Sequence, residues 1–222
     1  MNVWEAHAAS RLIDGPVDPL PAPDRFEWTQ RPGIGPGAEI LGKDLNGRLI
    51  MELGCGAGHN TAHLTAAGAR AIGVDRSSGQ VLRAIRHYQH TGAVFVHSSA
   101  LTYLMRTTGG LDAIVSVFGV IGMVEPTLLL AAAASRLVSG GVLAFSVPHP
   151  QRTGTIPPNP ITRHPVVLAG GVRGTVQRWE LDPAAWSRAL NRAGLITTDL
   201  QHLFAPADAR WPTTLLVTAR KP

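Results

Sequence analysis

Short apolar runs alternate with segments of helical periodicity over most of the chain. The apolar runs predict five strands, at 49–53, 70–74, 93–97, 111–117 and 142–147. The segments between them predict helices at 59–67, 77–90, 100–106 and 125–138. The pair Gly140-Gly141 is expected to end the last of these helices. Because strands that alternate with helices form parallel sheets covered on both faces, the pattern predicts an α/β fold.

The C-terminal part of the chain predicts a different connection between strands. Asp182 is expected to cap a helix from Pro183 to Ala193, with Pro183 in its first turn. Two more strands, at about 195–203 and 213–219, follow with only a loop between them. Strands joined without a helix pair antiparallel, so we expect an antiparallel pair at one edge of the sheet.

Two segments interrupt this alternation. Residues 1–47 form an N-terminal arm and cap, with a short helix from Val3 to Ile13 and an irregular, proline-rich stretch from Asp14 to Pro23. Residues 48–222 form the main domain, and within it residues 148–176 are rich in proline and glycine. A long irregular segment inside a compact domain commonly covers a functional site. We therefore expect residues 148–176 to be a lid.

A glycine-rich turn follows the first predicted strand, with Gly54, Gly56 and Gly58 at alternate positions. Glycine allows a sharp turn and close approach of a ligand to the backbone. The helix that starts there directs free N–H groups and a positive dipole end at that ligand. Asp75 ends the second predicted strand, where an acid can bind a ribose diol. The segment therefore predicts a nucleotide-like cofactor.

Two residues distinguish between kinds of nucleotide site. The dinucleotide pattern requires a third glycine where this chain has His59, and it has no fixed need for Glu52. The string Glu-Leu-Gly-Cys-Gly-Ala-Gly instead resembles motif I of the class I S-adenosylmethionine (SAM) methyltransferases. The resemblance extends over about residues 25–220 and implies a Rossmann-like sheet of seven mostly parallel strands, with an antiparallel C-terminal strand. It also implies SAM as cofactor and S-adenosyl-L-homocysteine as product.

The resemblance implies a set of cofactor contacts. Glu52 would lie at the base of the turn, Asn60 would bind the methionine carboxylate, and Asp75 would accept both ribose hydroxyls. Ser99 stands where relatives commonly have an aspartate that binds the adenine amino group, so that contact would be uncharged. The other expected contacts are Trp28, Gly54, Cys55, Gly56, Gly58, Arg76, Gln80, Ser98, Ala100, Val117 and Phe118. Trp28 is equally compatible with anchoring in an apolar groove, and Arg76 with full solvation.

His149 is the candidate catalytic base. It follows the fifth predicted strand, at the carboxyl edge where open α/β sheets bind ligands, and its ordinary pKa lies near neutrality. The alternative is that His149 only shapes the lid. His59 and His63 have a spacing that suits a metal, but no further ligand pattern accompanies them, so we expect no metal.

Composition and charge limit the partners. The chain has 222 residues, a formal net charge of +5 and scattered arginines without a basic run, so a nucleic-acid partner is not expected. The single cysteine, Cys55, excludes an internal disulfide. No apolar stretch reaches membrane-spanning length and no signal-like segment begins the chain, which favours a cytoplasmic protein without a membrane partner. A homodimer is compatible with the sequence.

The acceptor is narrowed by motifs that this chain lacks. The segment Val-Phe-Gly-Val begins at Val117, where the fourth predicted strand ends. It has neither the Asn/Asp-Pro-Pro-aromatic motif of amino-methylating DNA enzymes nor a nucleophilic cysteine. The Trp-Thr-Gln-Arg-Pro-Gly and Ser-Val-Pro-His-Pro segments resemble bacterial methyltransferases of small, often secondary, metabolites, including those of antibiotic biosynthesis. The resemblance therefore implies a small-molecule acceptor. An RNA methyltransferase, or a SAM-binding cyclase or regulator that transfers no methyl group, is the alternative.

Overall fold

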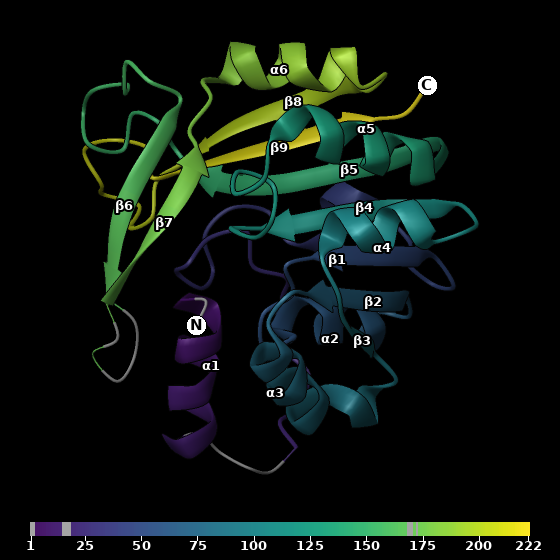
Figure 1. The fold of residues 1–222 in the computed structure, drawn as a ribbon. Helices are drawn as coiled ribbons and strands as arrows, with labels where there is room; N and C mark the ends of the chain where they lie inside the picture. Colours follow the sequence, from purple (N-terminus) through teal and green to yellow (C-terminus); the bar gives the residue numbers. More distant parts are fainter. Residues whose placement is uncertain (1–2, 15–18, 168–170, 172) are drawn as a thin grey trace.

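The computed structural model describes residues 3–14, 19–167, 171 and 173–222, and its centre is a seven-stranded sheet (Figure 1). The strand order is β3-β2-β1-β4-β5-β9-β8. The strands are β1 (Leu49–Leu53), β2 (Arg70–Asp75), β3 (Val94–His97), β4 (Leu111–Val117), β5 (Leu137–Pro148), β8 (Ile196–Leu203) and β9 (Thr214–Arg220). Strand β9 pairs antiparallel with both β5 and β8, and the pairs among β1 to β5 are parallel. The predicted mostly parallel sheet with one antiparallel C-terminal strand is confirmed.

The helices of the main domain lie where the sequence predicts them. They are α2 (His59–Ala66), α3 (Ser78–Tyr88), α4 (Ala100–Arg106), α5 (Pro126–Arg136) and α6 (Pro183–Arg192), with short 3-10 turns η1 (Ala38–Leu41) and η2 (Gln89–Thr91). A side chain caps the start of α3, α4, α5 and α6, whereas α2 begins after Gly58 without a side-chain cap. The Asp182 side chain accepts a hydrogen bond from the backbone N–H of Ala185 at 2.7 Å, and Pro183 occupies the first turn of α6, as predicted.

Alternate residues of the central strands face two separate apolar cores. Leu143 and Phe145 of β5 pack with Trp186 of α6 in one core, while Ala144 faces the other. The second core contains Phe26, Trp28, Leu41 and Leu45 from the N-terminal arm, together with Leu64 of α2. The arm therefore covers one face of the sheet, and these four side chains are part of the folded core.

One predicted helix end is wrong. Helix α5 ends at Arg136 and β5 begins at Leu137, so Gly140 and Gly141 lie inside the strand. Leu137 pairs with Leu111 but Val142 pairs with Ala113, which leaves three extra residues on β5. Gly140 has a φ of 76° and the backbone of Lys221 bonds to both glycines, at 2.9 and 3.0 Å. The glycine pair allows a bulge in a paired strand, a role that local sequence does not distinguish from a helix stop.

The second half of the predicted irregular lid is a β-hairpin, whereas residues 149–160 have no regular secondary structure, as predicted. Strands β6 (Ile161–Val167) and β7 (Arg173–Trp179) pair antiparallel and form a second, two-stranded sheet that stands beside the main one (Figure 1). Residues 168–170 and 172, which also belong to the predicted lid, lie outside the described residues. The sequence does not predict these strands, because residues of β6 alternate only between exposed and half-buried positions. Pro165 also argues against a strand in the sequence, although proline is tolerated in an edge strand such as β6.

The predicted N-terminal helix is confirmed as α1 (Val3–Asp14), which packs beside α3 and reaches β7 (Figure 1). The Glu5 carboxylate accepts hydrogen bonds from the backbone N–H groups of Ser78 at 2.7 Å and Gly79 at 3.3 Å. An acidic side chain is favourable at this point because the N-terminus of α3 carries unpaired donors and a positive dipole end. Of the predicted irregular stretch after α1, residues 15–18 lie outside the described residues, and residues 19–23 have no regular secondary structure.

Candidate active site

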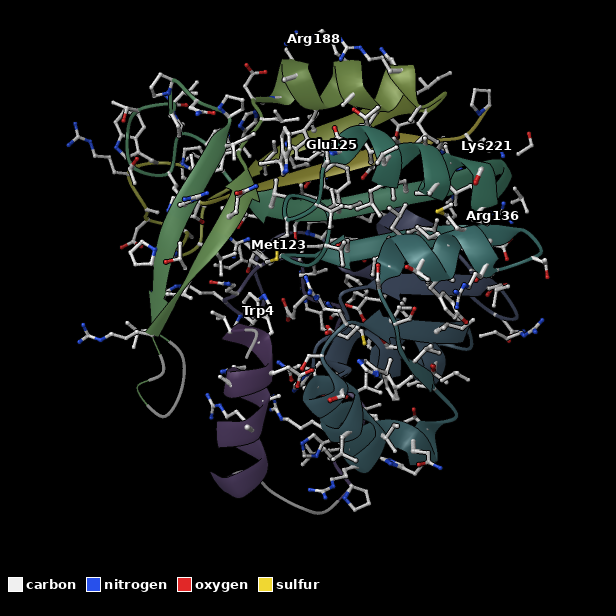
Figure 2. All side chains as sticks on the ribbon, viewed as in Figure 1. Trp4, Met123, Glu125, Arg136, Arg188 and Lys221 are labelled. Atoms are coloured by element: carbon white, nitrogen blue, oxygen red, sulfur yellow. The ribbon has the colours of Figure 1, made fainter. Side chains whose placement is uncertain are left out.

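A cavity of about 460 Å³ lies where β1, β2 and β4 end. Open α/β sheets bind ligands at this edge. The lining includes six of the predicted cofactor residues: Gly54, Gly56, Asp75, Arg76, Gln80 and Phe118. It also includes residues that were not among the predicted cofactor contacts: Val3, Trp4, Gly119, Val120, Met123, Val124, Thr175, Val176 and Gln177. The missed residues come from α1, β7 and the loop after β4, which only the tertiary fold brings to this edge (Figure 2).

The glycines of the turn have two different roles. Gly56 has a φ of 53°, and a β-carbon added there would meet no atom within 4 Å. Gly58 has a φ of 85°, and a β-carbon there would lie 2.7 Å from the Phe95 ring and 2.9 Å from Ala84. Gly56 therefore leaves space at the cavity that a ligand can occupy, whereas Gly58 allows α2 to pack closely on its neighbours.

Asp75 joins the glycine turn to the cavity. One carboxylate oxygen accepts the Gly56 N–H at 2.9 Å, and the other accepts the Ser77 N–H at 2.8 Å. Burial raises the pKa of Asp75, and these backbone hydrogen bonds oppose the rise. Each carboxylate oxygen can accept one further hydrogen bond, so Asp75 has acceptor capacity for two hydroxyl groups. The free space at Gly56 and the open acceptors of Asp75 fit the ribose of SAM.

Glu52 and Cys55 lie beneath the turn and do not line the cavity. Glu52 is 3% exposed, and its carboxylate accepts a hydrogen bond from the Thr61 hydroxyl at 2.5 Å. Burial raises the pKa of Glu52 to about 7 and raises that of the Cys55 thiol well above its usual value. Glu52 thus links β1 to α2, and Cys55 is a buried packing residue.

Two predicted contacts hold the arm instead of facing the cavity. The Asn60 side chain donates to the Glu27 carbonyl and accepts from the Glu27 N–H, both at 3.0 Å, so its amide is committed to the arm. Trp28 is fully buried in the second core, its ring centroid lies 4.5 Å from that of Phe26, and its indole N–H donates to the Gly37 carbonyl. The structure therefore favours the alternative for Trp28, anchoring in an apolar groove.

The remaining predicted contacts lie close to the cavity but outside its lining. The Ser98 N–H donates to the Asp75 carbonyl at 2.9 Å, and Ser99 is the N-cap of α4, followed by the buried Ala100. Val117 is the last residue of β4. These four residues stay predictions, because the geometry places them next to lining residues without bringing them into contact with the cavity.

Phe118 has an unusual backbone. Its φ is 47°, and it is the only non-glycine residue with positive φ among the described residues. Its N–H donates to the Ser146 carbonyl of β5 at 2.9 Å, which fixes the turn after β4. Side chains rarely adopt this conformation, and such strain is concentrated at functional sites.

A second cavity, of about 340 Å³, adjoins the first at Phe118, which lines both. Its other lining residues are Gln30, Arg31, Pro148, Arg152, His164, Arg178, Ala205, Thr213 and Thr214. They come from the arm, the β6–β7 hairpin, the end of β5 with the loop after it, and the β8–β9 loop with the start of β9. No sequence motif connects these segments, so the sequence does not predict this cavity.

The structure does not present His149 to either cavity. His149 is 2% exposed, its Nδ1 accepts the Gln151 N–H at 3.0 Å, and its Nε2 lies 2.8 Å from Nδ1 of His202. Burial, followed by the charges of His202 and Arg152, lowers the pKa of His149 to about 4. Both ring nitrogens are engaged, so the geometry favours the alternative in which His149 shapes the segment after β5.

The described residues contain no group of three or more His, Cys, Asp or Glu side chains that is placed to hold a metal ion. Nδ1 of His63 lies 2.8 Å from the Pro23 carbonyl oxygen, and the His59 ring packs against Tyr88. In the same part of the chain, no helix is both long and apolar enough to cross a bilayer.

Residues 50–141 match a family model described as a methyltransferase domain, and no curated protein matches the chain. A SAM-dependent methyltransferase from Mesorhizobium loti is 21% identical, with a TM-score of 0.63 over 82% of this chain and 95% of that one. A protein from Listeria monocytogenes, provisionally named a SAM-dependent methyltransferase, is 18% identical, with a TM-score of 0.67 over 83% and 95%. The 1,6-didemethyltoxoflavin-N1-methyltransferase of Burkholderia thailandensis is 19% identical, with a TM-score of 0.57 over 79% and 72%.

At these identities the solved structures show a shared fold, and the family model covers the glycine turn and the ends of β1, β2 and β4 at the first cavity. The strand order, the open space at Gly56 and the free acceptors of Asp75 agree with that assignment. Residues 50–141 therefore match a methyltransferase domain, and the chain has the fold of the SAM-dependent methyltransferases to which it is similar.

Proposed function

We propose that this chain is a class I SAM-dependent methyltransferase that acts on a small molecule, a secondary metabolite. The observation that carries the proposal is the pair of adjoining cavities, about 460 and 340 Å³, that meet at Phe118. Cavities of this size suit a small ligand. Helix α1 and strand β7 contribute Trp4 and Val176 to the first cavity, so chain segments border it opposite the sheet. An RNA helix requires a broad basic surface, which the scattered arginines do not predict.

The similar Burkholderia thailandensis enzyme supports a small-molecule acceptor, because its structure contains 1,6-didemethyltoxoflavin together with S-adenosylhomocysteine. We do not infer that this chain has the same acceptor. The similarity supports only the class of acceptor, and the residues of the second cavity determine its chemistry here.

We propose that the first cavity holds the cofactor and the second holds the acceptor. SAM supplies an electrophilic methyl group and a good leaving group when it is bound. Asp75 would hold the ribose, and the backbone around Phe118 and Gly119 would lie between the two cavities. Aligning two reactants can provide a large share of a rate enhancement. Because His149 is enclosed, we infer that positioning, and not proton removal by that residue, is the main contribution of this chain.

A methyl-labelling experiment tests the proposal. Purified protein is incubated with SAM that carries a labelled methyl group, and separately with fractions of small metabolites, RNA and protein from a bacterial extract. We expect label to enter the small-metabolite fraction, and the Asp75→Ala variant to abolish that transfer at limiting SAM. Label in RNA would instead support the RNA methyltransferase. Tight SAM binding without transfer to any fraction would support a cyclase or regulator.

A further inference from the structure

The second cavity contains more positive charge than its own side chains neutralise. It is lined by Arg31, Arg152, Arg178 and His164. The acid next to this group is Glu180, whose side chain is 1% exposed. One Glu180 oxygen is 2.7 Å from Arg152 and also 2.7 Å from His164. Glu180 is thus already paired with two partners.

Arg152 has a structural role in this cluster. Besides its contact with Glu180, it donates to the His149 carbonyl at 3.0 Å and so ties the hairpin to the segment after β5. Removing Arg152 would leave Glu180 buried without its main partner, which is costly. Arg152 therefore belongs to the framework of the cavity.

Arg178 and Arg31 are different, because neither guanidinium has an ion-pair or hydrogen-bond partner within the part of the chain that is described. Arg178 is only half-exposed. Its pKa is lowered, first by burial and then by the neighbouring charge of Arg152, while the charge of Glu180, which is already paired with Arg152 and His164, opposes this change. A cation in this position costs free energy unless an anion accompanies it.

Two features connect these arginines to the methyl-donor side. Phe118 lines both cavities. Strand β7 lines the first cavity with Thr175, Val176 and Gln177, and the next residue along it, Arg178, lines the second. A molecule held by Arg178 would therefore extend past Phe118 toward the cofactor.

We propose that the acceptor is an anionic small molecule, whose carboxylate or phosphate group binds Arg178 with Arg31 at the rim of the second cavity. This inference rests on the proposed function and defines its acceptor class. Guanidinium groups suit these anions because their planar donors match two oxygens at once. The anionic group anchors one end of the acceptor, and the Phe118 ring contacts the part nearer the methyl group.

The test measures binding of three probes to the protein saturated with S-adenosylhomocysteine, at constant ionic strength. Benzoate carries a carboxylate, phenyl phosphate carries a phosphate, and benzamide is neutral with nearly the same shape as benzoate. We expect at least one anion to bind at least tenfold more tightly than benzamide. The stronger of the two identifies the anionic group. Equal affinity for benzoate, phenyl phosphate and benzamide, or no binding of any of them, would overturn the proposal.

Variants locate the binding site. Arg178→Gln should weaken binding of the favoured anion at least tenfold, while Arg163→Gln, an equal charge change at an exposed position of β6, should alter it less than twofold. Arg178→Gln should leave the melting temperature unchanged or higher, because it removes an unpaired charge, whereas Arg152→Gln should lower it. Equal losses for Arg178→Gln and Arg163→Gln would overturn the assignment. Failure to bind S-adenosylhomocysteine would instead count against the cofactor site and the proposed function.

Discussion

At the scale of single residues, the glycines and the acid of the first cavity have separable effects on binding and folding. Gly56 leaves open space at the cavity, while Asp75 both holds the Gly56 N–H and offers further acceptors. Each of these contributions can be removed by one substitution. A residue elsewhere with the same backbone or capping role then provides the control.

Gly56→Val should abolish measurable SAM binding, because its side chain would occupy the space left open at the cavity. Valine at a φ of 53° also strains the backbone. Gly47→Val is the matched control, since Gly47 has a φ of 70° and open space but lies before β1, away from the cavity. Calorimetric titration should show normal SAM binding for Gly47→Val and no measurable binding for Gly56→Val. Normal binding by Gly56→Val would show that the turn does not contact the cofactor.

Asp75→Ala should reduce SAM affinity at least tenfold, since hydrogen bonds to a charged group each contribute about 1.5–3 kcal/mol. Asp182→Ala is the control, because Asp182 also accepts a backbone hydrogen bond but caps the distant helix α6. That variant should lose about 1 kcal/mol of stability and no SAM affinity. If calorimetry gives both variants the affinity of the unmodified protein, Asp75 does not bind the ribose.

At the scale of elements, α1 and the β6–β7 hairpin border the first cavity, where the sequence predicts an irregular lid. Val3 and Trp4 of α1 and Thr175 to Gln177 of β7 line the cavity, and a β-carbon on Gly174 would lie 2.1 Å from Val3. The two elements therefore touch at the cavity. The lid function stays a prediction, although its secondary structure differs from the one expected.

Glu5→Ala should loosen α1, because its carboxylate is bonded to the N-terminus of α3. Although burial opposes it, hydrogen bonding to Ser78 and Gly79 lowers the pKa of Glu5. We expect faster amide exchange in α1 and a few-fold faster SAM dissociation, measured by hydrogen exchange and stopped-flow fluorescence. Glu125→Ala, which removes a cap from α5, should change neither. Unaltered SAM dissociation from Glu5→Ala would exclude α1 as a lid.

At the scale of the whole molecule, two buried groups make stability depend on pH in opposite directions. The pKa of His149 is lowered to about 4, and that of Glu52 is raised to about 7. Their effects partly cancel in the unmodified protein between pH 4.5 and 6.5, so each contribution is isolated by replacing that group and comparing the variant with the unmodified protein.

His149→Gln should remove a loss of stability at acid pH. As pH falls from 6.5 to about 4, the unfolded chain protonates this histidine while the folded protein does not, so folding becomes less favourable. The shift corresponds to at most about 3 kcal/mol. Denaturant unfolding should show the difference in stability between variant and unmodified protein growing over that range and constant above it. A pH-independent difference would contradict the lowered pKa.

Glu52→Gln should act in the opposite pH direction. As pH rises from 4.5 to about 7, the unfolded chain ionises this carboxyl while the folded protein keeps its proton, so the unmodified protein loses stability. The variant, which can still accept the Thr61 hydrogen bond, should therefore gain relative stability up to about pH 7. Thermal melts at pH 5 and pH 8 measure this gain. An equal relative stability at both pH values would show that Glu52 is ionised when the protein is folded.

The sequence by itself determined the main sheet and the cofactor turn. Apolar runs such as 49–53, the acid at 75 and the Asp182-Pro183 helix start are local patterns, and local propensity, capping and backbone freedom suffice to predict their structure. For the same reason the antiparallel C-terminal strand was predictable, because a loop and no helix separates it from the strand before it.

Only the tertiary structure decided which side chains face a cavity. The resemblance implied that Asn60 and Trp28 lie at the site, and the position of His149 after a strand suggested the same, but packing turned Asn60 and Trp28 toward the arm and enclosed His149 beside His202. It also brought Arg31 and Arg178, 147 residues apart in sequence, to one cavity. Burial and charge pairing depend on contacts between distant segments, and these contacts leave no periodic signal in the chain.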